Sequence, residues 1–450
     1  MSARQILIYG RIIKIIKYII RKEGIIVLNL KNHPLRENLS KELHARPFPV
    51  LDAPCQVIFL ALTSNDDDEK YIQSLAEKLG GLDYISGSGH YYQDLGGYSL
   101  KWERHSEFVT YTIFLDGEEE TPFSDIAVNH FPSSWLDSLT CQIITAVKLR
   151  VVAPASTKQV EHDILTNFHT AFQSESLAIS YVLDKNAIVA SDFKVDENGY
   201  IRFGVLPIGQ VGRHRLGRIV QRLLEIETYR AMSMLTLPIA KKVFGRLTEL
   251  EKDLAITVQE ISGRAGTHKE NLDTLMTIAS EIEYLNAENA FRFGAGDAYS
   301  ALVDQRIFVL REERFLGRQT FSEFMMRRFS PTVRTCKAAQ TRLQDISDRA
   351  ARASDLLSTR VNVRTAAQNR TVLEQMDKRS ELQLKLQQTV EGLSVVAISY
   401  YGVNLLSYLL FPLAVAQGWE KYNLTSSLVI PVAFFVFYMV RRVRRHLTKS

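Results

Sequence analysis

Four basic side chains stand close together near the start of the chain, and they are the first candidates for chemistry. His33, Arg36, His44 and Arg46 fall within the stretch HPLRENLSKELHARPFP, residues 33–49. Arginine binds carboxylate and phosphate oxygens, and histidine exchanges a proton near neutral pH. These residues therefore predict an anion pocket or an acid–base site. The alternative is structural, with the same charges pairing with carboxylates to dock a short helix.

A second basic stretch, GQVGRHRLGRIVQR at residues 209–222, extends the anion-binding prediction to Arg213, Arg215 and Arg218. Glycines before a helix leave backbone N–H groups open to an anion, and Arg215, Arg218 and Arg222 would share one helix face. The glycine spacing matches neither the dinucleotide fingerprint nor a phosphate loop. The alternative is an exposed basic face that pairs with nearby glutamates or lies near lipid headgroups.

A third group lies in WERHSEFVTYT, residues 102–112. If this stretch is one strand, Glu103, His105 and Glu107 share a face but stand ~7 Å apart, too far to chelate a metal unaided. A solvated charged face is the alternative. No catalytic triad, zinc-binding spacing or nucleophile elbow is visible. We therefore predict no catalytic residue, no metal site and no cofactor.

The fourth candidate, Asn404, is a polar side chain inside an uncharged apolar run. Polar groups in such runs mark functional sites when the run crosses a membrane. The sequence Gly402-Val403-Asn404 resembles the Gly-Met-Asn or Gly-Val-Asn signature of CorA-type divalent-cation channels. Their order of soluble domain, long helices, two spans and basic tail is also similar. That resemblance implies a pore beside Asn404. In those channels, however, the signature closes the first span, whereas here thirteen residues of the run follow it.

Residues 31–210 hold most of the first three candidate groups, and their pattern predicts an α+β domain. Strand-like runs alternate with one helix that has acidic residues in its first turn and a glycine at its end. A β-hairpin is predicted around the turn that contains Asn198-Gly199. The strand-like runs are QVIFLAL, YSLKWERH, EFVTYTIFL, QIITAVKLRVVA, AIVASDFKV and YIRFGVLPI.

Residues 211–391 carry helical patterns and are predicted to form a stalk of long, coiled-coil-like helices. Breaks are expected at Pro238, at 263–266, at Gly294–Gly296 and at Pro331. The last helix, 331–391, could span roughly 90 Å at ~1.5 Å per residue. Its heptads are poor, so a turn near 359–363 that folds it into a helical hairpin is the alternative. The predicted helices are 212–237, 238–262, 267–286, 298–329 and 331–391.

Two apolar runs follow, and they predict a transmembrane hairpin over residues 392–440. Residues 392–417 contain no charge in 26 positions, and 424–440 form a second run of 17. A helix crosses a bilayer with ~20 apolar residues. Arginines fill the basic tail 441–450, and the positive-inside rule then places both termini in the cytoplasm. We expect a two-span protein of a bacterial inner membrane, with the lipid bilayer as a partner.

Residues 1–30 carry basic residues at helical spacing with isoleucines between them. They predict either a basic amphipathic segment on an anionic membrane surface or a start site assigned too early. A net charge of +5 over 450 residues is mild and predicts no nucleic-acid partner. Three widely spaced cysteines indicate reduced thiols.

Several motifs in order resemble a bacterial family of predicted membrane-anchored proteins that carries only a domain-of-unknown-function label. The motifs are HPLR with HARPF, KWERH-x-EF, GR-x-VQRLLEIETYR, NAENAFRFGA and LQQTVEGLSVVAISYY. The resemblance covers residues 32–445 and implies a C-terminal membrane hairpin but no activity.

Our leading hypothesis is a non-enzymatic, membrane-anchored scaffold or interaction protein that self-associates through its helical stalk. One alternative is a distant CorA-like cation channel. The other is a membrane-tethered enzyme or a nucleotide or anion sensor, which requires the HARP and GRHRLGR segments to converge in space.

Overall fold

A computed structural model of the chain divides into two compact units, which are described separately. The predicted N-terminal segment 1–30, together with His44 and Arg46, lies outside the described residues. The described residues are 33–37, 39–40, 48–117, 123, 127–154, 172, 175–263, 268–416, 418 and 420–447. The first unit takes its residues from 1–252 and 280–347, and the second from 253–279 and 348–450.

The first unit is built on a mixed sheet, which confirms the α+β prediction. Among the described residues the strand order is β2-β3-β4-β1-β5-β8-β7-β6-β9. Strands β5 and β8 pair in parallel, and the other neighbours pair antiparallel. The strands are β1 Cys55–Thr63, β2 His90–Asp94, β3 Tyr98–Arg104, β4 Phe108–Asp116, β5 Ile143–Val151, β6 Ala178–Val182, β7 Ala187–Val195, β8 Ile201–Pro207 and β9 Glu313–Arg314.

The predicted β-hairpin joins β7 to β8. Gly199 has a φ of +87° in its turn, a conformation that glycine adopts without a steric cost. The Asp196 carboxylate accepts hydrogen bonds from the backbone N–H groups of Asn198 and Tyr200. The turn residues thus fix the hairpin locally, as the sequence indicates.

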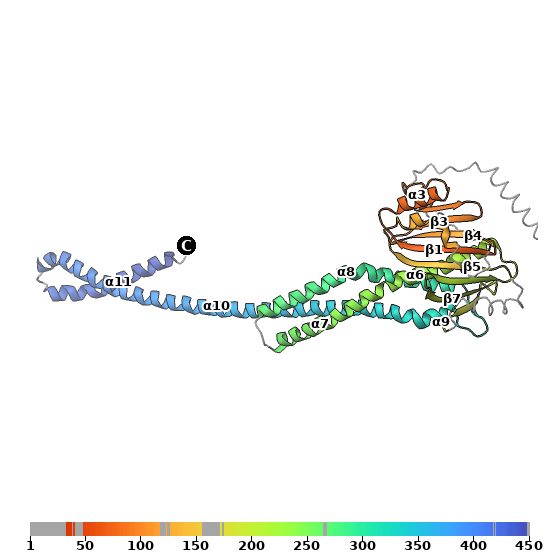
Figure 1. Cartoon of the computed structure of the whole chain (residues 1–450). Helices are drawn as coiled ribbons and strands as arrows, with labels where there is room; N and C mark the ends of the chain where they lie inside the picture. Colours follow the sequence, from red (N-terminus) through yellow and green to blue (C-terminus); the bar gives the residue numbers. More distant parts are fainter. Residues whose placement is uncertain are drawn as a thin grey trace, which may run out of the picture. The chain divides into compact units, whose positions relative to one another are not determined.

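Alternate residues of the strands bury into two separate cores on the two faces of the sheet. Ile58 and Leu60 face a core covered by α3 (Asp68–Lys78) and α4 (Ser133–Leu136). Val57 and Phe59 face the other core, which α6 (Arg213–Met234) covers. Figure 1 shows α6 beside β5 and β7.

A backbone contact holds the segment before β1 against the start of α6. A Cβ atom at Gly217 would stand 1.7 Å from the Pro49 carbonyl oxygen, so only glycine permits this approach. Leu51 donates its backbone N–H to the Arg213 carbonyl and is buried in the core beneath α6. The stretch that follows the HARP motif is therefore packed on the GRHRLGR segment.

Long helices follow, as predicted, but their breaks differ from the prediction. The expected interruption at Gly294–Gly296 is wrong, because one helix runs through it. Gly296 is needed there for close packing, since a Cβ atom would lie 2.4 Å from the Thr236 hydroxyl. The helices are α7 Thr236–Gly263, α8 His268–Phe308, α9 Phe321–Arg328, α10 Ser330–Ala416 and α11 Lys421–Leu447.

The 87-residue helix α10 has no turn at 359–363, so the alternative of a helical hairpin there is wrong. Buried residues recur at alternating spacings of three and four up to Leu357. The same register continues with charged residues such as Arg360 and Arg364, and residues 361–390 are exposed throughout. The regular seam therefore ends where its apolar residues end. The buried seam consists of Cys336, Ala339, Leu343, Ile346, Ala350, Ala353 and Leu357.

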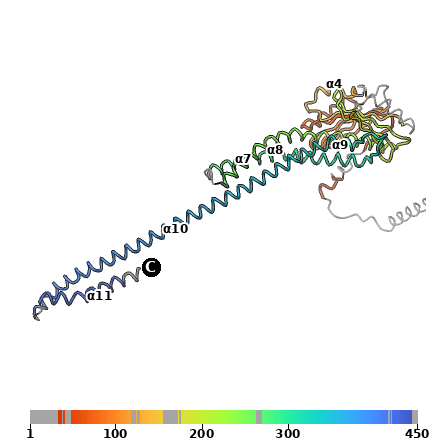
Figure 2. Tube along the Cα trace, turned by 90° about the horizontal axis from the view of Figure 1, so that it is seen from below, coloured from red at the N-terminus to blue at the C-terminus, as the bar shows by residue number. Residues whose placement is uncertain are grey.

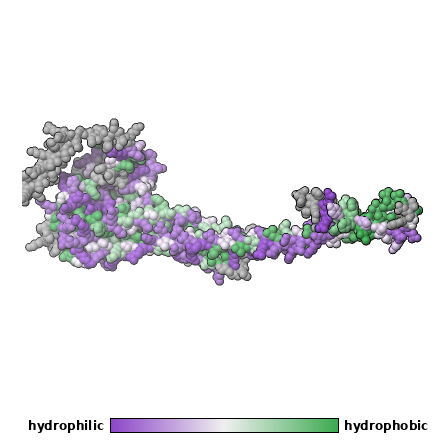
Figure 3. Space-filling model, turned by 180° about the vertical axis from the view of Figure 1, so that it is seen from behind, coloured by the Kyte–Doolittle hydropathy of each residue, from purple (hydrophilic) through white to green (hydrophobic). Residues whose placement is uncertain are grey.

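Two helices, α10 and α11, are long and apolar enough to cross a membrane. The end of α10 and α11 lie side by side (Figure 2) and pack through Val403, Val432 and Val436. A Cβ atom on Gly402 would stand 3.1 Å from Val432, so a small residue sits at their closest approach. Apolar surface gathers over this end of the chain (Figure 3).

The Gly217 contact leads to a stability prediction. Replacing Gly217 by Ala forces a backbone overlap, so the free energy of unfolding should fall by at least ~2 kcal/mol. Gly245→Ala is the matched control, because Gly245 is an exposed helical glycine with open space around it. That change should stabilise the protein by up to ~1 kcal/mol. Guanidinium unfolding followed by tryptophan fluorescence measures both; equal effects would contradict the close contact.

Candidate functional site

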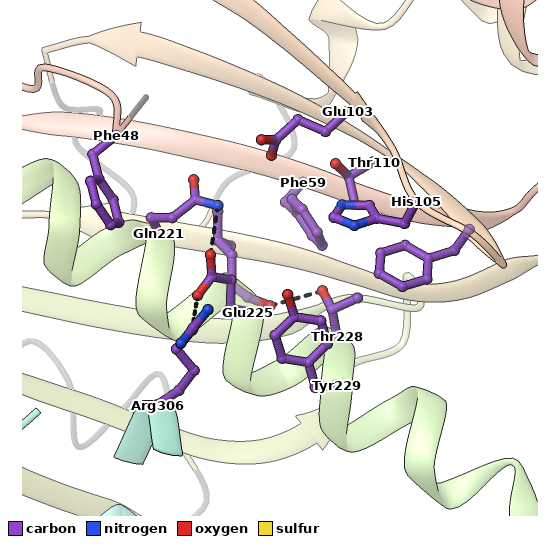
Figure 4. Close-up of a pocket in the computed structure, with 12 residues that line it drawn as sticks. Phe48, Phe59, Glu103, His105, Thr110, Gln221, Glu225, Thr228, Tyr229 and Arg306 are labelled. Atoms are coloured by element: carbon purple, nitrogen blue, oxygen red, sulfur yellow. Dashed lines mark hydrogen bonds and ion pairs between the residues drawn. The ribbon is translucent and has the colours of Figure 1, made fainter. Parts of the chain in front are cut away.

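A cavity of about 260 Å³ lies between the sheet and α6 (Figure 4). Glu103, His105 and Phe108 line its sheet side. Gln221 and Glu225 line it from α6. The cavity thus joins the KWERH and VQRLLEIETYR segments, which are more than a hundred residues apart in sequence. Phe48 and Arg306 also line the cavity.

A buried ion pair forms the sheet side of the cavity. Lys101 and Glu103 point to the same face of β3 because they are two residues apart. Their charged atoms lie 3.0 Å apart, and both side chains are at most 7% exposed. Lys101 Nζ also donates to Gln221 Oε1 at 3.1 Å, which ties the pair to α6. The ammonium group thereby compensates a carboxylate that burial would otherwise destabilise.

The α6 side of the cavity carries a second carboxylate whose negative charge is balanced by a cationic side chain. Gln221 and Glu225 are one turn apart, and Gln221 Nε2 donates to Glu225 Oε1 at 3.1 Å. Arg306 of α8 donates its Nε–H to the other oxygen of Glu225. The two carboxylates that line the cavity therefore each have a cationic partner.

The turn between β3 and β4 forms the third wall of the cavity. It differs from the single strand that the sequence predicts over residues 102–112. Residues 105–107 are not strand, so Glu107 does not share a face with Glu103 and His105. His105 instead stacks on Phe108 at 4.3 Å, and Glu107 accepts two hydrogen bonds from Arg292 at 3.2 and 3.3 Å. Among the described residues there is no cluster that could hold a metal ion.

Tyr299 adds to the network around Glu107. Burial, together with the Glu107 carboxylate, raises the pKa of Tyr299 to about 12. Its ring stacks on Tyr229, a residue that lines the cavity, at 5.8 Å. The tyrosine therefore stays neutral and serves to position Tyr229.

The predicted anion-binding arginines of α6 do not converge on one point. Arg213 pairs with Asp52 at 2.6 Å, and Arg215 donates to Asn186 Oδ1 at 3.1 Å. Arg218 instead lies one turn before Arg222 on the side of α6 that carries Glu225. Burial and the neighbouring charge of Arg218 lower the pKa of Arg222, so positive charge is concentrated there.

The described part of the first basic stretch, which includes His33 and Arg36, does not form an enclosed binding site. His33 and Arg36 are exposed, and His33 Nδ1 accepts the backbone N–H of Leu35 at 3.2 Å. Leu35 and Leu39 are more than half exposed, so this short helix does not bury its apolar stripe against the described residues. Of the described residues of this stretch, Phe48 alone lines the cavity.

Asn404 lies apart from this cavity, in the apolar part of α10. It is half-buried, and one turn further on Ser407 is buried with its hydroxyl unpaired within the described residues. Ser399 also has an unpaired, buried hydroxyl. This segment therefore holds several polar groups whose partners the described chain does not supply.

Sequence reasoning named Glu103 and His105 but missed Gln221, Glu225 and Arg306. Gln221 and Glu225 could have been detected as polar residues at helical spacing on the otherwise buried face of α6. Arg306 depends on where α8 packs, and no local pattern reports that.

The chain belongs to the protein family of unknown function DUF3422, which it matches over residues 31–447. The resemblance to a domain-of-unknown-function family is therefore confirmed. No curated protein and no solved structure shows significant similarity to the chain. The CorA-like similarity stays a prediction.

The Glu107–Arg292 pair yields a second prediction. Arg292→Ala should lower the free energy of unfolding by about 3 kcal/mol, because it leaves Glu107 charged and largely buried without its partner. The control is Arg370→Ala, which breaks an exposed pair with Glu374 and should cost at most about 0.5 kcal/mol. Denaturant titrations compare the two. A cost as small as the control's would mean that the buried pair does not stabilise the turn.

Proposed function

We propose that the protein is a non-enzymatic interaction protein anchored in a bacterial inner membrane by the apolar parts of α10 and α11. The observation that carries this proposal is the exposure of these charge-free segments. Leu405, Leu409 and Phe434, for example, are about 70% exposed in the described chain. Soluble proteins rarely expose contiguous apolar surfaces of this extent. A bilayer is the solvent that removes them from water.

The positions of the charged residues along the helices support a hairpin in which the first span begins and the second span ends on the same side of the membrane. Gly402 lies against Val432. Glu391 is eleven positions before Gly402, and Arg441 is nine positions after Val432. At ~1.5 Å per residue these charges end at similar heights along the helix pair. The arginines after Val440 favour the cytoplasm for that end. The first unit would then work at the cytoplasmic surface.

Self-association is the second part of the proposal, and it rests on the exposed stretch of α10, residues 361–390. A helix of this length gains most of its stability from packing, yet no described element covers it. It exposes large apolar side chains, including Leu373, Met376 and Leu384. Copies anchored in one membrane present the same stretch at high effective concentration. A second copy of this chain is the partner that fits.

Charge insertion tests the anchor. Leu405→Arg, Leu409→Arg, Ile430→Arg and Phe434→Arg together place two arginines in each proposed span, at ~2.5–3.5 kcal/mol each for insertion. The variant with all four changes should leave the carbonate-resistant membrane fraction, because neither span stays intact. The matched control, Leu373→Arg, Leu382→Arg, Leu384→Arg and Leu386→Arg, changes four exposed leucines outside the apolar segments and should remain in that fraction. Equal fractionation of the two variants would refute the anchor.

The mass of the protein in lipid nanodiscs tests self-association. Native mass spectrometry should detect a dimer or larger assembly, because the exposed stretch of α10 needs a partner. Replacing Leu373 and Met376 by Glu should convert it to a monomer without changing membrane insertion. A wild-type monomer would contradict the proposal.

A cation channel is the second candidate, favoured by the half-buried Asn404 and the unpaired hydroxyls of Ser399 and Ser407. Two spans per chain cannot enclose a pore alone, so this function requires a ring of copies. Divalent-cation flux through liposomes that Asn404→Ala abolishes would support it. A dimer without flux would exclude it.

A further inference from the structure

The cavity between the sheet and α6 has hydrogen-bond acceptors that the protein leaves unused. Glu103 Oε2 contacts Lys101, whereas Oε1 has no hydrogen-bond partner among the described residues. In Figure 4 its carboxylate points into the cavity. The Thr110 hydroxyl lines the same wall and has no partner in the described part of the chain. A buried carboxylate oxygen in this position is suited to accept an N–H from a ligand.

Aromatic rings surround these acceptors. Phe59 and Phe108 are nearly fully buried in the cavity wall, and Phe48 is 46% exposed at its end. A volume of about 260 Å³ is close to the lower end of the range for small-molecule sites, ~300–1,000 Å³. The inner part of the cavity is therefore suited to a flat, partly apolar body with N–H donors on its edge.

Positive charge lies on the α8 side of this cavity. Arg306 is part of the wall, where its Nε–H binds Glu225 and its Nη2 has no hydrogen-bond partner among the described residues. Arg218 lies two turns before Glu225 on the same helix face. Arg218 has no ion-pair partner among the residues that the structure describes. Arg222 is held nearby through a hydrogen bond to the Val309 carbonyl at 3.1 Å. Guanidinium groups so grouped fit the oxygens of a phosphate.

We propose that this cavity binds a purine nucleoside monophosphate. The base lies among the phenyl rings and donates an N–H to Glu103 Oε1, and the phosphate lies against Arg218 and Arg306. Glu103 sets the direction, because its free oxygen accepts an N–H and repels a phosphate. The phosphate lies instead where Arg306 balances the charge of Glu225 and Arg218 adds a further positive charge. The proposal concerns binding alone, and it holds whether or not the proposed membrane anchor does.

Isothermal titration of the full-length protein in phosphatidylcholine nanodiscs tests the proposal, with AMP and GMP as ligands. At least one of them should bind, and more tightly than inorganic phosphate or the nucleoside without its phosphate. Arg218→Ala should weaken that binding at least tenfold, and Phe48→Ala should weaken it by removing a ring from the base. Both changes are on accessible side chains, and unchanged thermal unfolding would show that the variants fold.

Arg213→Ala is the matched control, because Arg213 belongs to the same helix but pairs with Asp52. It should leave the affinity unchanged. Three results would overturn the proposal: neither nucleotide binds, inorganic phosphate binds as tightly as the nucleotide, or the Arg213 and Arg218 variants bind equally well.

Discussion

The packing of α6 on the sheet depends on one backbone contact, in which the Pro49 carbonyl lies where a side chain at position 217 would be. Because residue 217 is glycine, the segment before β1 can cross the helix directly. Leu51 then enters the core and Phe48 reaches the cavity. The same contact brings Asp52 to Arg213. The start of the chain, the sheet and the cavity wall are thus fixed together.

The interface beneath α6 is unusual because part of it is polar. Lys101, Glu103 and Gln221 are joined at one end, and Thr145 donates to Glu227, which also pairs with Arg230, further along. Well-packed apolar residues are often as stable as buried ion pairs or more so. The hydrogen bonds and ion pairs make such a layer tolerable and hold its groups in fixed positions. A fixed polar layer beside a cavity is what ligand recognition requires.

Much of the fold could be predicted because local rules decide it. The Asn198-Gly199 turn, the strand alternation and the charge-free C-terminal runs each carry their own signal. The helix break predicted at Gly294–Gly296 was wrong, since Gly296 marks a close contact between helices and not a break. The site was only half visible: Glu103 and His105 stood out, but Glu107 turned away to Arg292. Which residues face a shared cavity depends on how α6 and α8 pack, and spacing along the chain does not report that.

The exposed apolar parts of α10 and α11 are proposed to lie in lipid. Spin labels attached at Leu405 and Phe434, in a variant without the three native cysteines, test this placement in nanodiscs. A third label at Leu382 serves as the water-exposed reference. If these segments lie in lipid, oxygen should relax the labels at Leu405 and Phe434 more than a water-soluble nickel complex does. The label at Leu382 should show the reverse order. Equal access of the nickel complex to all three labels would contradict it.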